Sequence, residues 1–198
     1  MRKSAFLAIL ICIAVFLAGC STKMNNTDAD TDFKGAETSV QENRNNKKQY
    51  TINTKISDVI NDPVFANYGR LIFPVNNGYY SVDTLGELGL IWYNNIDPDK
   101  TVEITNYMKN HAENGDAIFY DIYTDEEKAA DPTKENTGLF FFKGNPGERF
   151  AVCNAGGGFA YVGAMHDSFP HALELSKMGY NAFALIYRPG AQTACEDL

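Results

Sequence analysis

The sequence has no surplus of basic residues. Its 198 residues carry 17 lysines and arginines against 25 aspartates and glutamates, which gives a formal net charge of -8. Proteins that bind nucleic acid need clustered lysine and arginine to neutralise phosphates, and no basic face can be built here. The same shortage argues against electrostatic attraction to anionic lipid headgroups. We therefore expect no nucleic-acid partner.

Cysteine is also scarce, with four in the whole chain. Cys12 and Cys20 belong to the N-terminal segment, so only Cys153 and Cys195 fall in the part with globular composition. Two cysteines form neither a disulfide framework nor the ligand set of a structural zinc site. We interpret both as small, buried thiols, with a Cys153–Cys195 disulfide as the open alternative. No metal or cofactor is expected.

The N-terminus reads as a targeting segment. Arg2 and Lys3 precede an apolar run over residues 5–18. This run is shorter than the ~20 residues of a membrane-spanning helix. It ends in Leu17-Ala18-Gly19-Cys20, which resembles the lipobox of bacterial lipoproteins. We predict a signal peptide over residues 1–19 and a lipid on Cys20, hence an exported protein anchored to the bacterial envelope. An ordinary secretory signal is the alternative.

Composition divides the remaining chain into three parts. Residues 20–48 are polar with almost no apolar content, which is typical of a flexible tether. Residues 49–116 predict an α+β extension or pocket wall, with a strand over 71–75 and a helix from Asp97-Pro98 to Asn114-Gly115. Residues 117–198 predict a strand over 117–123, another over 139–142, and the segment described next.

The stretch from Phe150 to Tyr187 has the clearest pattern of secondary structure in the sequence. Residues 150–153 predict a strand buried on both faces, and Gly156–Gly158 follows it directly. Asp167 or Ser168 is the expected N-cap of a helix that continues to Met178. Residues 182–187 are a second apolar strand. Strand, glycine loop, helix and strand make a βαβ unit, so the predicted fold class is α/β.

This stretch resembles the N-terminal half of an α/β-hydrolase, close to the carboxylesterase and feruloyl-esterase-like branch. Asn154-Ala155-Gly156-Gly157-Gly158-Phe159 matches the glycine-rich loop that follows the third strand of that family. The resemblance implies a mixed sheet with flanking helices, whose later strands are parallel. It also implies that residues 182–187 lie inside the sheet and residues 150–153 at an edge of this chain.

The resemblance further implies the chemistry of the loop. Hydrolysis of an ester builds negative charge on the carbonyl oxygen, and backbone N–H groups aimed at that oxygen stabilise it. By resemblance the donors are the N–H groups of Gly157 and Gly158, and the substrate is an ester of plant or carbohydrate origin. Two other readings of the glycines remain: a tight strand-to-helix turn, and a phosphate-binding loop, which the residues after Gly158 do not favour.

The catalytic triad of the family has no counterpart in the sequence. No serine stands in a G-x-S-x-G motif, and neither His166 nor His171 follows such a serine as the family's chain order requires. We therefore interpret the sequence as the front half of a serine esterase, truncated before the nucleophile elbow and inactive by itself. A non-catalytic binding module of the envelope and a product without function are the alternatives.

Cys20→Ala tests the predicted anchor. The substitution removes the only atom to which the lipid could be attached, so we expect unprocessed precursor and no incorporation of a tagged fatty acid. Metabolic labelling measures both. Label uptake by the variant that equals uptake by the parent would show that Cys20 is not the anchor.

Overall fold

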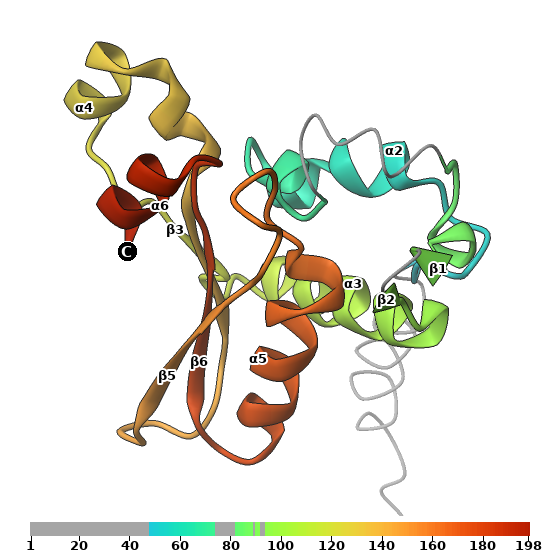
Figure 1. Cartoon of the computed structure of the whole chain (residues 1–198). Helices are drawn as coiled ribbons and strands as arrows, with labels where there is room; N and C mark the ends of the chain where they lie inside the picture. Colours follow the sequence, from blue (N-terminus) through green and yellow to red (C-terminus); the bar gives the residue numbers. More distant parts are fainter. Residues whose placement is uncertain (1–47, 74–81, 89, 92–93) are drawn as a thin grey trace, which may run out of the picture. The chain divides into compact units, whose positions relative to one another are not determined.

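The computed structural model describes residues 48–73, 82–88, 90–91 and 94–198. From Lys48 to Leu198 the chain forms one compact unit, and its buried apolar residues make one contiguous core. A mixed four-stranded sheet packs there against helices on one of its faces (Figure 1). The protein is therefore of the α/β class. Cys20, the targeting segment and most of the expected tether lie outside the described residues.

The described residues before the first long helix form short helical elements and two very short strands. These elements are α2 (Ile56–Ile60), η1 (Pro63–Phe65), η2 (Gly69–Leu71), η3 (Leu85–Glu87) and the two-residue strands β1 (Leu90–Ile91) and β2 (Asn94–Asn95). The strand predicted over residues 71–75 is wrong for its described part, because Leu71 ends η2 and a bend follows. Residues 71–73 are all buried, so the apolar run reflects packing into the core rather than pairing in a sheet.

Helix α3 (Pro98–Glu113) confirms the helix predicted between Asp97 and Gly115. The Asp97 carboxylate accepts a hydrogen bond from the N–H of Asp99 at 2.9 Å, and Pro98 occupies the first turn, where its missing N–H costs nothing. Lys109, on the buried side, pairs with Asp62 at 2.6 Å and so ties α3 to η1. Within the described ranges, no helix combines the length and apolar content needed to cross a bilayer.

The sheet contains β3 (Phe119–Tyr120), β4 (Gly138–Phe142), β5 (Phe150–Asn154) and β6 (Asn181–Ile186), in the order β3-β4-β6-β5. β6 pairs with β4 in antiparallel register and with β5 in parallel register. The interior place of β6 and the edge place of β5 confirm the predicted strand order. β3 is shorter than the strand predicted over residues 117–123.

The connections between strands carry the remaining helical elements. Between β3 and β4 lie α4 (Asp125–Ala130) and η4 (Pro132–Asn136). Between β5 and β6 lie η5 (Ala164–His166) and α5 (Ser168–Lys177), and α6 (Ala191–Asp197) follows β6. The path β5–α5–β6 is thus the predicted βαβ unit.

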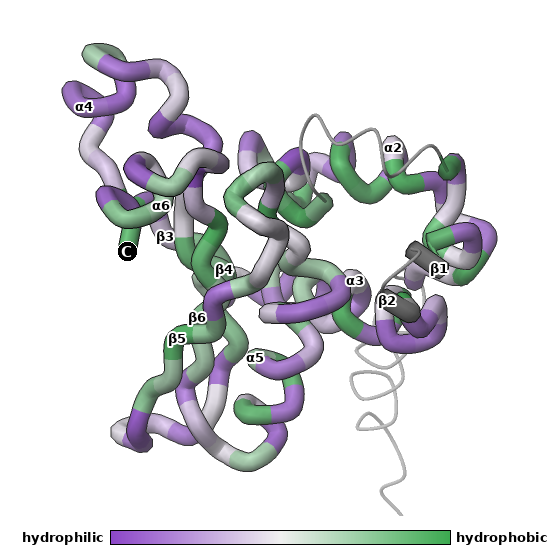
Figure 2. The backbone as a smooth tube through the Cα atoms, viewed as in Figure 1, coloured by the Kyte–Doolittle hydropathy of each residue, from purple (hydrophilic) through white to green (hydrophobic). Residues whose placement is uncertain are grey.

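One face of the sheet is covered. α3 and α5 both lie on this side in Figure 1, and the strands that they cover are largely apolar in Figure 2. Phe140 and Phe142 of β4 are fully buried here, where they meet the ring of Phe169 from α5 at 5.1 and 5.8 Å between centroids. Burial of such large rings is the main apolar contribution to the core.

The opposite face of the sheet is open, so the expectation that residues 150–153 are buried on both faces is wrong. Phe150 is 72% exposed and Val152 is 49% exposed, because an edge strand covered by α5 on one side alternates between half-buried and solvent-facing residues. Aromatic rings continue across this face, with Phe141 stacked on Phe183 at 4.8 Å and Phe150 edge-on to Phe183 at 6.5 Å. We call Tyr120, Phe141, Phe150, Val152 and Phe183 the aromatic sheet face.

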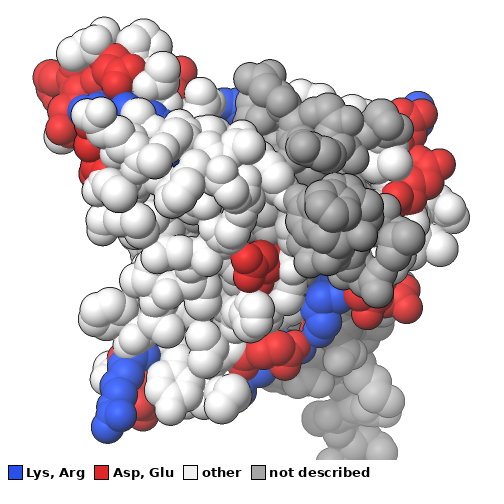
Figure 3. Space-filling view, in the orientation of Figure 1, with Lys and Arg blue, Asp and Glu red and all other residues white. Residues whose placement is uncertain are grey.

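Figure 3 shows that charged side chains are few over β5, β6 and the loop that follows β5 in this view. Open backbone groups at the β5 edge, next to exposed apolar side chains, are a template for pairing with another chain. We expect the chain from Cys20 onward to bind the hydrophobic dye ANS and to associate at micromolar concentration. In hydrogen exchange, amides of Ala151 and Val152 should be less protected than those of Leu185 and Ile186.

Val152→Lys should reduce both dye binding and association, because it places a charge on the edge strand while removing little buried surface. Met178→Lys is the matched control, since Met178 is also exposed but lies beyond the end of α5. ANS fluorescence and sedimentation velocity measure the two effects. Equal responses of the two variants would contradict a role of the β5 edge.

Candidate functional site

The glycine loop lies at the carboxyl end of β5. We define it as residues 155–163, between the last residue of β5 and η5. Gly157 has φ of 149° and Gly158 has φ of 60°, both in the region that side-chain-bearing residues rarely adopt. A Cβ at Gly157 would collide with the carbonyl oxygen of Tyr161, whereas a Cβ at Gly158 would meet open space. Gly157 is thus required for the turn itself, and Gly158 leaves the loop open to an incoming molecule.

The N–H groups of Gly157 and Gly158 are available to a ligand. Neither has an acceptor among the described residues, whereas several neighbouring backbone groups of the loop are engaged. The carbonyl of Gly157 accepts from Ala160 at 3.0 Å, and the N–H of Gly163 donates to the carbonyl of Gly156 at 2.9 Å. The structure therefore places the two residues singled out in the sequence together, with their donors unused.

Asp167 holds the start of this loop. Its Oδ2 accepts a hydrogen bond from the N–H of Gly156 at 2.7 Å. The expectation that the Asp167 side chain caps α5 is wrong: it is the N-cap residue by position, but its side chain accepts no hydrogen bond from the helix. Its φ and ψ of -131° and -81° depart from the extended backbone of a capping residue, and the carboxylate turns to the loop instead.

Two further contacts come from the end of β6. The buried hydroxyl of Tyr187 donates to the carbonyl of Ala155 at 2.6 Å. The N–H of Gly190 donates to the carbonyl of Phe159 at 2.8 Å. The start and the middle of the loop are therefore held by residues that follow the interior strand of the sheet.

A buried ion pair fixes the turn that contains Gly190. Arg188 is 5% exposed, and its guanidinium donates to both carboxylate oxygens of Asp197, with the shortest contact at 2.8 Å. It also pairs with Asp131 at 2.9 Å and with Glu196 at 3.1 Å. Burial alone would raise the pKa of Asp197, but hydrogen bonds from Arg188 and Tyr123 outweigh it and hold this pKa below its usual range. This cluster joins β6, α6 and η4.

Besides Asp167, the titratable side chains next to the loop include Cys153, His166 and His171. Burial raises the pKa of the Cys153 thiol, and the charge of Asp167 adds to this, so the reactive thiolate is disfavoured. Burial lowers the pKa of His166, which lies half-buried beside the loop rather than at the surface. His171 is exposed, and its Nδ1 lies 2.6 Å from the backbone carbonyl oxygen of Asp167.

The burial of Cys153, Cys195 and Ser168 tests what the sequence predicted for the thiols and for a possible nucleophile. Cys153 is half-buried, but Cys195 is exposed, so the prediction of two buried thiols is wrong for Cys195. Both thiols are free, which decides against the disulfide alternative. Ser168 is buried, and its hydroxyl has no partner among the described residues. A hydroxyl closed off from solvent in this way cannot meet a substrate.

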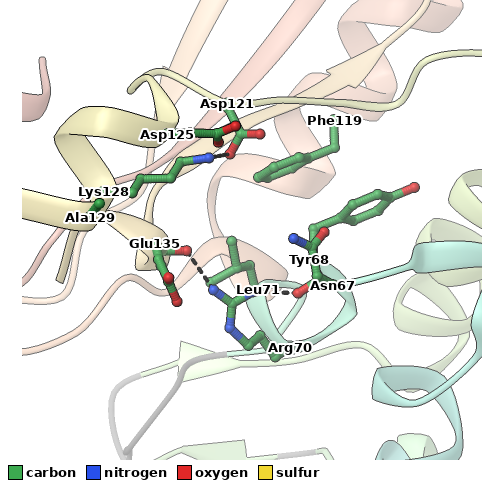
Figure 4. A pocket seen from close by; sticks show the side chains of 10 residues that line it. All are labelled: Asn67, Tyr68, Arg70, Leu71, Phe119, Asp121, Asp125, Lys128, Ala129 and Glu135. Atoms are coloured by element: carbon green, nitrogen blue, oxygen red, sulfur yellow. Dashed lines mark hydrogen bonds and ion pairs between the residues drawn. The ribbon is translucent and has the colours of Figure 1, made fainter. Parts of the chain in front are cut away.

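One cavity lies away from the glycine loop. It has a volume of about 560 Å³, between the η2 region and α4 (Figure 4). Its charged groups are already engaged with protein atoms: Lys128 pairs with Asp121, and Arg70 donates to the backbone carbonyls of Asn67 and Glu135. A small cavity of about 50 Å³ lies nearer the loop, against Tyr161 and Tyr187. Among the described residues there is no cluster of side chains suited to hold a metal ion.

Some functional residues escaped sequence reasoning. The roles of Asp167, Tyr187 and Arg188 depend on contacts between segments far apart in the chain. The spacing of Asp167 after the glycines carried no signal of its carboxylate turning back to Gly156. Tyr187-Arg188 at the end of an interior strand was the one available hint, since polar residues there face the loops of a parallel pair.

Comparison with known proteins gives no further identification: no protein-family model, no curated protein and no solved structure matches this chain.

The Arg188 cluster yields a stability prediction. Asp197→Ala should lower the free energy of unfolding by about 3–5 kcal/mol, because it leaves a buried guanidinium without its main partner. Glu196→Ala is the matched control on the same guanidinium; the Glu196 side chain is 48% exposed, and we expect a loss of ~0–1 kcal/mol. Urea unfolding followed by far-UV circular dichroism measures both.

The ion pair between Arg188 and Asp197 also predicts how the free energy of unfolding depends on pH. Since the pKa of Asp197 is lower in the folded chain than in the unfolded chain, its contribution is present above about pH 4 and is lost as the pH falls further. Asp197→Asn should remove that part of the acid sensitivity. Equal losses from Asp197→Ala and Glu196→Ala at neutral pH would show that burial of the pair does not matter.

Proposed function

We propose that this chain carries the oxyanion-binding half of an α/β-hydrolase, a serine carboxylesterase held at the bacterial envelope by a lipid on Cys20. The observation that carries the proposal is a pair of unused backbone donors, Gly157 and Gly158, at the carboxyl end of a parallel strand. The substrate would be a carboxylic ester, of plant or carbohydrate origin by family resemblance.

The strand order supports the hydrolase part of the proposal. The family resemblance requires residues 182–187 inside the sheet and residues 150–153 beside them, and the observed order β3-β4-β6-β5 has this arrangement. It also requires later strands that run parallel, as β5 and β6 do. The glycine loop then follows the strand that the family uses for its own oxyanion loop.

The loop has the physical properties that oxyanion binding needs. Backbone donors that are already fixed lose no free energy to reorganisation when charge appears on the substrate oxygen. Asp167, Tyr187 and Gly190 fix the loop from three sides while leaving Gly157 and Gly158 unused. The sparsely charged surface around the loop in Figure 3 suits a neutral ester.

These residues supply only part of an acyl-transfer site. No serine of the sequence stands in a G-x-S-x-G motif, and Ser168, the one closest to the loop in sequence, is buried. The proposal therefore assigns to this chain the binding of the acyl oxygen, and assigns the nucleophile, acid and base to none of its residues.

Binding of methylphosphonate tests the proposed donors, because its tetrahedral oxyanion imitates the charge that develops on an ester. Labelling with [15N]glycine limits the amide spectrum to the 16 glycines of the sequence. In the full-length chain, kept in detergent micelles, we expect saturable shifts of Gly157 and Gly158. Gly158→Ala should weaken binding about tenfold, since a methyl group then enters the open side of the loop.

Gly147→Ala is the matched control. Gly147 also has positive φ, 78°, and open space at its Cβ position, so the backbone penalty should be similar while binding stays unchanged. If neither Gly157 nor Gly158 responds to the anion, or if both variants weaken binding equally, the glycines serve only as a tight strand-to-helix turn.

A further inference from the structure

We propose that Asp167 is a positioning residue for the oxyanion site: its carboxylate orients the glycine loop so that the N–H groups of Gly157 and Gly158 point outward. This inference rests on the proposed function. The inference goes beyond the proposed function because it assigns a role to Asp167. The catalytic triad does not require this residue, and the sequence analysis interpreted it as a helix cap.

The geometry supports this role. Asp167 reaches back to the loop to bind the N–H of Gly156 at 2.7 Å, and the carbonyl of the same Gly156 binds the N–H of Gly163 at 2.9 Å. The peptide groups on both sides of Gly156 are therefore held. Since Gly156 directly precedes the two open donors, the direction in which Gly157 and Gly158 point depends on this anchor.

The backbone of Asp167 is itself well held. Its N–H donates to the carbonyl of Ala164 at 3.3 Å, and its own carbonyl oxygen lies 2.6 Å from Nδ1 of His171. These contacts come from η5 on one side and α5 on the other. The backbone that carries the carboxylate is thus held in place. A residue that positions a site needs such support.

The charge of Asp167 works against anion binding, so its benefit has to be geometric. A carboxylate near an oxyanion repels it, although partial exposure screens the repulsion. A hydrogen bond to a carboxylate is short and directional, which favours one orientation of the Gly156 peptide. Geometry and charge can be separated, because asparagine keeps an acceptor oxygen and removes the charge.

The test compares Asp167→Asn and Asp167→Ala by [15N]glycine spectra and methylphosphonate titration of the full-length chain in micelles. In wild type and Asp167→Asn we expect the Gly156 amide to keep the downfield shift of a strong hydrogen bond, and in Asp167→Ala to lose it. Binding to Gly157 and Gly158 should be at least as tight in Asp167→Asn as in wild type, and about tenfold weaker in Asp167→Ala.

Asp97→Ala is the control for a general loss of stability, since Asp97 caps α3 far from the loop, and the loop signals should not change. Equally tight binding by both Asp167 variants, above that of wild type, would show that Asp167 acts only as a repelling charge and would overturn the proposal. Unchanged Gly156, Gly157 and Gly158 signals in Asp167→Ala would also overturn it. Absence of methylphosphonate binding in wild type would instead refute the proposed function, while the Gly156 shift still decides whether Asp167 anchors the loop.

Discussion

The structure depends on the interior position of β6. This strand pairs with β4 on one side and with β5 on the other, so it is the one strand that links the antiparallel and the parallel part of the sheet. The crossover through α5 returns the chain to this position and covers one face of the sheet on the way. Because Tyr187 and Arg188 follow directly, the same strand also delivers the side chains that support the glycine loop.

Several backbone groups of the glycine loop have partners within the chain, whereas the N–H groups of Gly157 and Gly158 have none among the described residues. Buried or half-buried backbone groups normally find partners, and those around Gly156 and Phe159 do. Gly158 is exposed and Gly157 is half-buried, so the two donors face solvent and are accessible to a ligand. Backbone donors of this kind can bind negative charge without any basic side chain.

Sequence reasoning succeeded where local patterns decide the structure. The apolar runs of β4, β5 and β6, the helix signals of α3 and α5, and the glycines between β5 and η5 all lie within single segments, and the family resemblance supplied the strand order. It failed where tertiary contacts decide. Exposure of Phe150 depends on which face α5 covers, and the orientation of Asp167 depends on a loop eleven positions away. Residues 71–73 showed that a buried apolar run does not by itself indicate a strand.

The strand order also has a consequence for biosynthesis. On the ribosome both neighbours of β6 are made before β6 itself, so β5 has no partner and β4 has only β3 until the crossover helix has emerged. During that interval one edge of β4 and both edges of β5 lack a neighbouring strand. The interior strand that completes the sheet is therefore the last of its four strands to be made, and β4 and β5 gain their shared neighbour only at that point.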